Sequence, residues 1–323
     1  MFRFLKPKRK PPLPPPEAKR LHRIAGPTMG TEFRVTFAAA DLDTVALGRL
    51  LHQAVAAVDR DMSTWKHDSA LSHFNRAPCG DWFAVPPNLA LVVAQGLAIS
   101  AASQGAFDMT LGQAVNAWGF GPDTPAALPD GPQALGQYRA LTARLDPPAL
   151  RKTAAFALDL SGIAKGYGVD ELARVLQTQG ITDCLCEIDG ELRAHGRKPG
   201  LDGLWTVALA APLRDQNAAW DVLDVQDCAL ATSGDYRRYV RSHGKIRAHT
   251  IDGRTGWPVD NNLASVTVRH ESCMIADAWA SALMVLGPSD GPAMADAHNL
   301  AALFLIRDGD QITEKRSTRF RQT

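Results

Sequence analysis

The first part of the chain shows two hydrophobic periods in succession. Residues 31–37 alternate between apolar and polar side chains as a strand does, and Leu47, Leu51 and Val58 then recur at the spacing of one helix face. Asp43, a residue type that caps helix N-termini, stands just before this helical pattern. The patterns predict a strand that leads directly into a long amphipathic helix.

The same criteria predict further elements along the chain. Helices are expected near residues 89–103, 113–118, 163–179 and 274–286. Strands are expected near residues 154–160, 184–188, 192–195, 205–210, 221–225, 236–241, 245–251, 263–269 and, as the final buried strand, 301–306. Loops are expected at residues 63–76 and at the Pro/Gly-rich residues 122–132. Hairpins with interspersed helices indicate an α+β fold with mostly antiparallel sheets and packed helices.

Charge is distributed unevenly along the chain. The 323 residues include 35 Lys and Arg and 34 Asp and Glu, but the first 24 residues alone hold eight basic side chains and one acid. The remaining residues hold 27 basic and 33 acidic side chains, a net charge of −6, without the basic stripe that a nucleic-acid interface requires. We therefore expect no nucleic-acid partner.

The basic head also contains a run of prolines, a composition that favours an extended, unpacked segment. The sequence predicts a disordered tether over residues 1–24 and one folded domain over residues 25–323; the basic head is a candidate for contact with an anionic membrane or a partner. No uninterrupted apolar stretch follows the positive start, so neither an export signal nor a lipid-bearing Cys is expected, and a cytoplasmic location is predicted. A start or export route not visible in the sequence would place the protein at the periplasmic face of the inner membrane.

The five cysteines are an odd number and show neither CxxC nor Cys/His ligand spacing. We expect them to be reduced, with Cys184 and Cys186 as small buried side chains on one face of a strand. Neither a disulfide framework nor a zinc knuckle is predicted.

Residues 159–168 form the first candidate site. They join a predicted strand to a predicted helix through small residues, an arrangement that lets backbone N–H groups at the positive end of a helix approach a phosphate, and Lys165 would add a cation. The spacing is neither that of a P-loop nor GxGxxG. Close packing of a strand against a helix explains the small residues equally well.

Asp277 and Ser281 form the second candidate site, on a predicted helix that is otherwise almost entirely apolar. At positions i and i+4 their oxygens lie on one face. Because an unpaired buried carboxylate is costly, Asp277 needs a cation, a metal or good hydrogen-bond donors. One carboxylate and one hydroxyl suit a hard ion such as Mg²⁺, which takes further oxygens from water and phosphate. A structural hydrogen bond of Asp277 near the helix start is the alternative.

Other side chains suit a nucleotide pocket. His249 ends a predicted hairpin strand, where it can act as a base or, as is more common for a lone His, have a structural role. Trp65 in its polar loop, or Asp108 next to Phe107, can line a pocket for a flat ring, although each taken alone is more simply a core residue. Residues 231–238 offer hydroxyls and basic groups, which a turn with solvated arginines explains as well.

Together these segments resemble the FAD:protein FMN transferase (ApbE) family from about residue 26 to about residue 286. The matching motifs occur in the family's order, at residues 28–31, 62–65, 69–75, 106–108, 159–166, 231–235, 249–258 and 276–283. A set of ordered motifs is far more specific than any one of them.

The resemblance implies a T-fold-like flavin transferase architecture. It implies an enzyme that cleaves the diphosphate of FAD with Mg²⁺, transfers FMN to a Ser or Thr hydroxyl of an acceptor protein and releases AMP. Mg²⁺ would be held by the backbone carbonyl of Ala164, the carboxylate of Asp277 and the hydroxyl of Ser281, and His249 would deprotonate the acceptor hydroxyl, with Asp277 as the second catalytic residue. Contacts to FAD would come from Met29, Trp65, Ala106, Phe107, Asp108, Ser161, Lys165, Thr250 and Ile251. A subunit of a membrane redox complex is one candidate acceptor.

Three features depart from the family pattern. Ser281 stands where Thr is usual, which keeps the ligand oxygen; residues 189–191 read Asp-Gly-Glu where Gly-Gly-Asp is more usual; and the basic head stands where many relatives carry a lipoprotein signal. Two alternatives stay open: hydrolysis of FAD with water as the acceptor, and a flavin-binding or flavin-delivering protein that does not turn over.

Overall fold

An eight-stranded sheet, antiparallel throughout, forms the centre of the protein. The computed structural model describes residues 19–123, 125–199, 203–213, 218–236, 238–242, 244–309 and 311–322. From one edge to the other, the strands of this sheet are β1 (Arg20–Thr28), β2 (Thr31–Ala39), β6 (Cys184–Ile188), β7 (Glu191–His195), β10 (Cys228–Gly234), β15 (Leu263–His270), β16 (Ala301–Asp308) and β17 (Gln311–Arg316).

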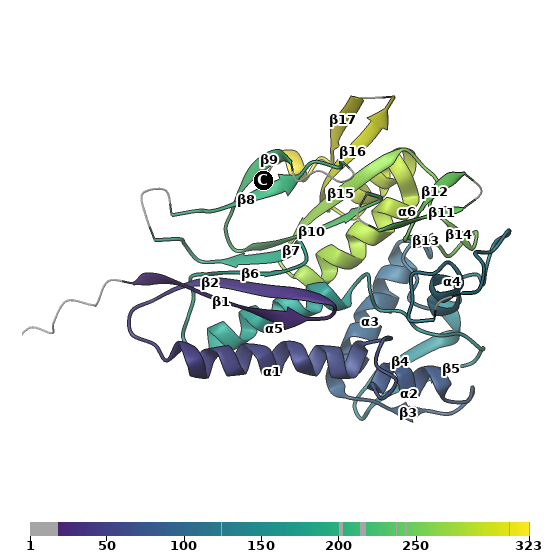
Figure 1. Ribbon diagram of the computed structural model, residues 1–323, viewed down its shortest axis with the longest axis horizontal. Coiled ribbons are helices and arrows are strands. Elements are labelled where there is room, and N and C mark those ends of the chain that lie inside the picture. Colours follow the sequence, from purple (N-terminus) through teal and green to yellow (C-terminus); the bar gives the residue numbers. More distant parts are fainter. Residues whose placement is uncertain are drawn as a thin grey trace, which may run out of the picture.

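Three long helices cover one face of the sheet: α1 (Thr44–Met62), α5 (Ala164–Thr178) and α6 (Cys273–Ala297). Figure 1 shows α1 and α5 along the β1–β2 end and α6 along β10 and β15. Helix α1 begins where the sequence predicts, because the Asp43 carboxylate accepts hydrogen bonds from the backbone N–H groups of Val45 and Ala46. Its predicted apolar face, including Leu47 and Leu51, is buried.

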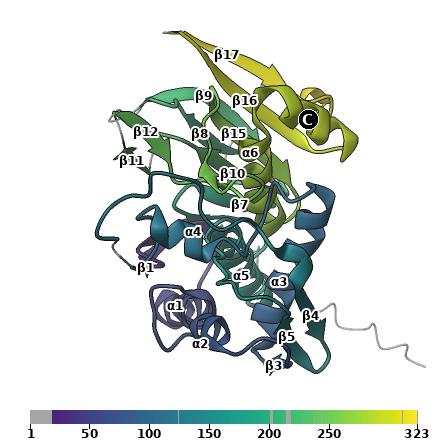
Figure 2. The ribbon, with the colours of Figure 1, turned by 90° about the vertical axis from the view of Figure 1, so that its right-hand side faces the viewer.

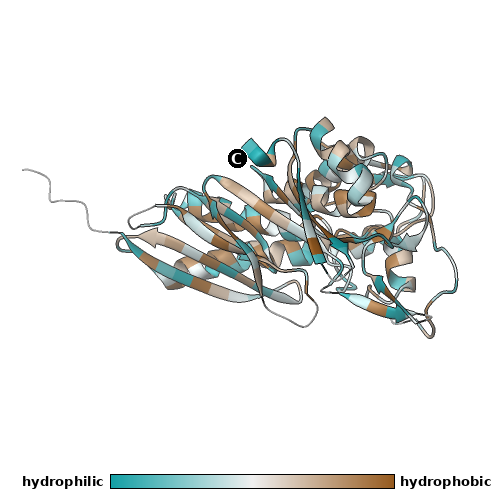
Figure 3. Ribbon diagram, turned by 90° about the horizontal axis from the view of Figure 1, so that it is seen from above, coloured by the Kyte–Doolittle hydropathy of each residue, from teal (hydrophilic) through white to brown (hydrophobic). Residues whose placement is uncertain are grey.

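A hairpin of β8 (Trp205–Ala210) and β9 (Ala219–Val225) covers part of the opposite face. Figure 2 shows α5 and this hairpin on opposite sides of β7. Side chains alternate between the two layers, so that Leu230 of β10 packs with the hairpin while its neighbour Ala231 packs towards the helices. Figure 3, seen from above, shows hydrophobic and hydrophilic residues following one another along the strands of the sheet.

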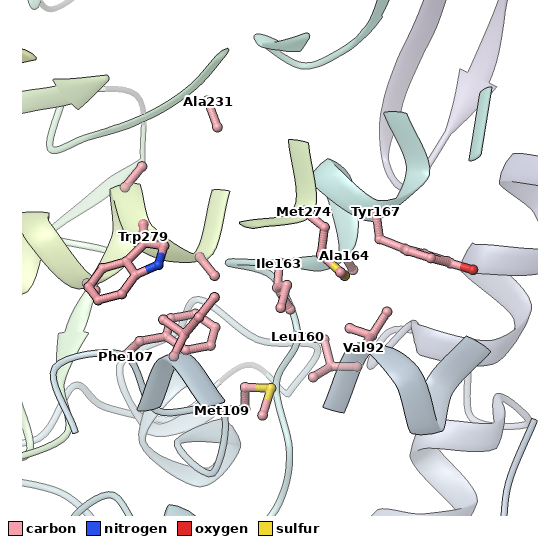
Figure 4. Close-up of a cluster of buried hydrophobic side chains, with 14 of the residues drawn as sticks. Val92, Phe107, Met109, Leu160, Ile163, Ala164, Tyr167, Ala231, Met274 and Trp279 are labelled. Atoms are coloured by element: carbon pink, nitrogen blue, oxygen red, sulfur yellow. The ribbon is translucent and has the colours of Figure 1, made fainter. Parts of the chain in front are cut away.

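A second group of elements lies at the other end of the helical layer (Figure 1). It comprises α2 (Ala70–Arg76), α3 (Pro87–Ala102), α4 (Gly112–Ala117) and a small sheet of β3 (Phe83–Ala84), β4 (Leu141–Leu145) and β5 (Pro148–Lys152). One hydrophobic cluster joins this group to α5 and α6. In Figure 4, Ile163 lies in the middle of the cluster, with Phe107 and Trp279 on one side and Tyr167 on the other.

Short elements complete the fold, and several of them border the site described below. They are β11 (Tyr239–Ser242), β12 (Lys245–Ala248), β13 (Ile251–Asp252), β14 (Trp257–Pro258) and the 3-10 turns η1 (Tyr138–Ala140) and η2 (Phe320–Gln322). The predicted hairpin over residues 236–251 is confirmed as β11–β12, although residues 237 and 243 lie outside the described part of the chain.

The structure confirms the α+β class with antiparallel sheets but corrects several predicted elements. Residues 154–160 form no strand, and only Ala157 makes an isolated bridge there, to Leu111. The predicted loop over residues 63–76 contains α2, which Ser69 caps by accepting a hydrogen bond from Ser72 N. Strand β16 is the last buried strand, as predicted, but the mostly exposed β17, which pairs with it, was not predicted.

The boundary of the predicted tether is also corrected. Strand β1 begins at Arg20 and pairs with β2 along its whole length, so the predicted boundary at residue 24 falls inside a strand. Residues 1–18, the rest of the predicted tether, lie outside the described residues.

The cysteines have the state that the sequence predicts. All five are free thiols, and Cys184 and Cys186 are fully buried on the helical side of β6. Within the described residues, no helix combines the length and the hydrophobicity needed to cross a membrane.

Candidate functional site

Two cavities meet beside the N-terminus of α5. The first, of about 190 Å³, lies among residues 106–111, β7, β10, His249 and α6. The second, of about 570 Å³, lies between the end of α1, Trp65 and the start of α5. Ser161, Lys165 and Arg238 line both cavities. The two cavities therefore form one bipartite site with Lys165 at the junction.

The start of α5 is fixed against α6 by direct backbone contact. Gly166 has no room for a side chain, because a Cβ there would come within 2.7 Å of the carbonyl carbon of Cys273 and 2.8 Å of Met274 Cα. The Gly166 N–H donates a 3.0 Å hydrogen bond to Asp277 Oδ2. Small residues in this segment therefore serve close packing, and that packing brings the two predicted sites together.

Asp277 and Ser281 lie in the wall of the first cavity, as the i and i+4 spacing predicts. Asp277 is 3% exposed, and burial raises the pKa of its carboxyl, while Lys165 and the hydrogen bond from Gly166 act in the opposite direction. Ser281 Oγ is 3.3 Å from Ser233 Oγ. A buried carboxylate and a hydroxyl thus face a polar cavity together.

The donor types fit a hard divalent ion. In the part of the chain that the structure describes, no three His, Cys, Asp or Glu side chains form a ready-made metal cluster. One carboxylate, one hydroxyl and a backbone carbonyl suit an ion such as Mg²⁺, which leaves its remaining positions to water and phosphate oxygens. Ala164, whose carbonyl is the third predicted ligand, lines the second cavity rather than the first.

Lys165 is surrounded by acidic side chains. Its Nζ lies 2.8 Å from Glu191 Oε2 and 3.8 Å from Asp189 Oδ2. Burial alone would lower the pKa of Lys165, but the charges of Glu191 and Asp277 raise it above its ordinary value. The pKa of Glu191 is raised to about 7, chiefly by burial, with Lys165 opposing the shift.

His249 lies in the wall of the same cavity as Asp277. Its Nδ1 is 3.3 Å from the carbonyl oxygen of Arg238, and the ring of Phe120 meets its ring edge to face. Burial lowers the pKa of His249 to about 4, and the positive charges of Lys165 and Arg238 add to that effect. A neutral imidazole that donates from Nδ1 to this carbonyl leaves the Nε2 lone pair available as a base.

The residues expected to contact FAD divide between the two cavities. Ala106, Phe107, Asp108, Thr250 and Ile251 line the first, Met29 and Trp65 line the second, and Ser161 and Lys165 line both. All the candidate site residues from the sequence therefore border this one site. Trp65 is 66% exposed. It is therefore not a core residue, which was the simpler interpretation of this aromatic taken alone.

Asp108 has a structural role in addition to bordering the first cavity. Its Oδ1 accepts from the Thr110 N–H at 2.8 Å and from the Thr110 hydroxyl at 2.6 Å, and its Oδ2 accepts from the Tyr138 N–H at 3.2 Å. Burial raises the pKa of this carboxyl despite those bonds. Asp108 thus fixes the loop that forms the cavity wall.

Four more side chains line the first cavity: Ser233, Arg238, Asp189 and Glu191. Ser233 and Arg238 belong to residues 231–238, whose hydroxyls and basic groups the sequence offered, whereas Asp189 and Glu191 were not predicted as site residues. The Asp-Gly-Glu sequence at residues 189–191, which departs from the family's usual Gly-Gly-Asp, could have marked Asp189 and Glu191 as site residues. Nothing in the sequence, however, placed that turn beside Lys165.

Comparison with known proteins assigns the family. The model of the ApbE family matches residues 29–304. The FAD:protein FMN transferase of Vibrio cholerae is 36% identical over 312 residues, which cover 94% of this chain and 92% of that protein. The FAD:protein FMN transferase of Escherichia coli K12 is 34% identical over 310 residues, which cover 92% of this chain and 88% of that protein. The chain belongs to the ApbE family, and it is a transferase.

Solved structures agree with this assignment. The flavin transferase ApbE from Vibrio cholerae superposes with a TM-score of 0.85 at 34% identity, covering 94% of this chain and 99% of that one. The apo form of the Pseudomonas stutzeri flavinyl transferase ApbE gives a TM-score of 0.84 at 34% identity, covering 94% and 97%. The predicted architecture of an ApbE flavin transferase is therefore confirmed.

Proposed function

We propose that this protein is an FAD:protein FMN transferase that cleaves the FAD diphosphate with Mg²⁺, joins FMN to a Ser or Thr hydroxyl of an acceptor protein and releases AMP. The observation that carries the proposal is the bipartite site, which joins two cavities through Lys165 beside Asp277 and His249. FAD has a matching shape, because a diphosphate links its two flat ring systems. The names of the relatives support the same substrate.

The charge of the site supports the requirement for a divalent cation. The described side chains that line the first cavity include five carboxyl groups, those of Asp108, Asp159, Asp189, Glu191 and Asp277, and two cationic groups, those of Lys165 and Arg238. An anionic diphosphate gains little net attraction from such a wall. Ala164, Asp277 and Ser281 would hold Mg²⁺, which when bound neutralises the diphosphate and polarises its phosphorus–oxygen bonds.

His249 would serve as the general base. Nε2 takes the proton of the acceptor hydroxyl, and the acceptor oxygen forms a bond to the phosphorus on the flavin side. The bond from that phosphorus to the bridging oxygen breaks, and AMP leaves with the electron pair. Lys165 lies where it can contact the diphosphate, and phosphoryl-type transfer depends mainly on such positioning and charge neutralisation.

The proposal is tested by incubating the protein with FAD, Mg²⁺ and a domain that bears a Ser or Thr flavinylation site, with Asp277→Asn as the matched control. We expect FMN on the acceptor and AMP in solution with the wild type, and neither with the variant. AMP release at a rate that the acceptor does not change would favour FAD hydrolysis instead. Bound FAD without any AMP would indicate a non-catalytic flavin-binding protein.

The proposed acceptor is a flavoprotein, with a subunit of a membrane redox complex as the leading candidate, and the basic head would bring the enzyme to a membrane. Of the eight basic residues within the first 24, five lie before residue 19 and provide charge for attraction to anionic lipid outside β1. The proposed location is the cytoplasm, or the periplasmic face of the inner membrane if the chain is exported. Deletion of residues 2–18 keeps β1 intact, and unchanged partitioning of that variant into membranes in cells would reject the membrane role.

A further inference from the structure

The ion pair of Lys165 and Glu191 lies at the junction of the two cavities. Glu191 is the first residue of β7 and follows a tight turn in which Asp189 and Gly190 both have positive φ. Its side chain is 4% exposed, whereas that of Asp189 is 32% exposed. The strand and the turn therefore hold the Glu191 carboxylate against the Lys165 ammonium at 2.8 Å.

This pair affects any ligand that spans both cavities. Lys165 borders both of them, so the diphosphate of a dinucleotide passes its ammonium group. That ammonium already has a buried carboxylate partner, and removing one member of a buried ion pair leaves the other charge uncompensated, which is costly. A diphosphate that contacts Lys165 therefore meets an ammonium whose charge Glu191 already neutralises, and it also faces the negative charge of Asp189 and Asp277.

We propose that Glu191 is the specificity-determining residue that makes FAD binding depend on a divalent cation. Because the Glu191 carboxylate already neutralises the Lys165 ammonium, a free diphosphate gains little attraction from the charge of this lysine. A diphosphate that enters with a divalent cation brings its own neutralising charge and does not need to break the pair. The inference rests on the proposed use of FAD, and it concerns the binding step, which is measurable without transfer.

The test compares Glu191→Gln with the wild type and uses Asp189→Asn as a second, milder variant. Dissociation constants of FAD and of riboflavin, which lacks phosphate, are measured by flavin fluorescence at pH 8, where Glu191 is ionised, with Mg²⁺ and with EDTA. We expect Glu191→Gln to bind FAD in EDTA about tenfold more tightly than the wild type, since one negative charge beside the diphosphate is removed. Riboflavin affinity and FAD affinity in Mg²⁺ should change by less than about threefold.

Asp189→Asn should shift FAD affinity in EDTA in the same direction by about threefold, because this carboxylate is farther from Lys165 and more exposed. Its exposure makes it the variant that keeps the fold. Thermal melting shows whether Glu191→Gln folds. If it does not, the result for Asp189→Asn decides: an FAD affinity in EDTA equal to that of the wild type overturns the inference.

Three results would overturn the proposal while leaving the enzyme's function intact. They are a wild type that binds FAD equally well in EDTA and Mg²⁺, a Glu191→Gln variant with unchanged metal dependence, and a riboflavin shift as large as the FAD shift. A wild type that binds FAD in neither buffer contradicts the proposed function itself and this inference with it.

Discussion

The contact between α5 and α6 at Gly166 provides the sharpest structural prediction. In Gly166→Ala, the new methyl group overlaps the carbonyl of Cys273 and approaches Met274 Cα, both in the backbone of α6. Backbone atoms cannot rotate away, and both helices are also packed against the main sheet. The helices must separate locally, which lengthens the 3.0 Å bond from Gly166 N–H to Asp277.

The expected magnitude follows from two opposing effects. Overpacking a tight contact costs about 1–3 kcal/mol, and the cost here is near the upper end because the neighbouring atoms belong to the backbone. Replacing glycine by alanine in a helix stabilises the helix by about 1 kcal/mol. We therefore expect Gly166→Ala to lower the free energy of unfolding by about 2 kcal/mol. Gly168→Ala is the matched control, because its Cβ would meet only the side-chain ends of Met29 and Ile188, at 2.8 and 3.0 Å.

The assay is urea unfolding of wild type and both variants, followed by circular dichroism. Gly168→Ala should lie within about 1 kcal/mol of the wild type, because flexible side-chain ends move aside and the helix propensity improves. Equal stability of Gly166→Ala and wild type, or an equal loss in both variants, would refute the close approach of α5 to α6.

Further predictions concern the cavity wall. His249→Gln should lower kcat by about 10²–10⁴-fold while the FAD dissociation constant changes by less than about threefold; a binding defect alone would contradict its role as a base. Because the pKa of His249 is lowered to about 4, the pH profile of kcat should lack an acid limb near pH 6.5. Burial raises the pKa of Asp277 above its ordinary value near 3.8, so the wild type loses stability as pH rises above that value and Asp277 ionises in the folded state. The unfolding free energy of Asp277→Asn should therefore increase relative to that of the wild type over the same rise in pH, and an unchanged difference would argue against burial of that carboxylate. Ser281→Ala should raise the Mg²⁺ concentration for half-maximal rate about tenfold, and Ser281→Thr should leave it nearly unchanged.

Elements with a clear period could be predicted from the sequence, while those that depend on tertiary partners could not. Strand β6 and helix α1 lie where their patterns place them. Residues 154–160 alternate like a strand, but the side-chain amide of Asn75 takes the place of a neighbouring strand, donating to Leu158 O at 2.9 Å and accepting from Leu158 N at 2.8 Å. Strands β4 and β5 are only five residues long each, with Pro147 in the turn between them and Pro148 as the first residue of β5, and they show too little periodicity to be recognised.

The candidate site was predictable as a set of residue types but not as a geometry. The spacing of Asp277 and Ser281 places both on one helix face, and that prediction is confirmed. Whether His249 lies near them depends on how β12 and β13 meet the end of β10, which no local pattern specifies. Glu191 was missed because an acid after a turn is normally solvated; it is buried here because α5 crosses β6 and β7.

Flavin transfer by this protein is tested most directly by the intact mass of an acceptor domain after incubation with the protein, FAD and Mg²⁺, together with a measurement of released AMP. We predict a mass gain equal to FMN less one water on a single Ser or Thr, one AMP per modified acceptor, and neither product with Asp277→Asn. An unmodified acceptor alongside intact FAD would contradict this prediction.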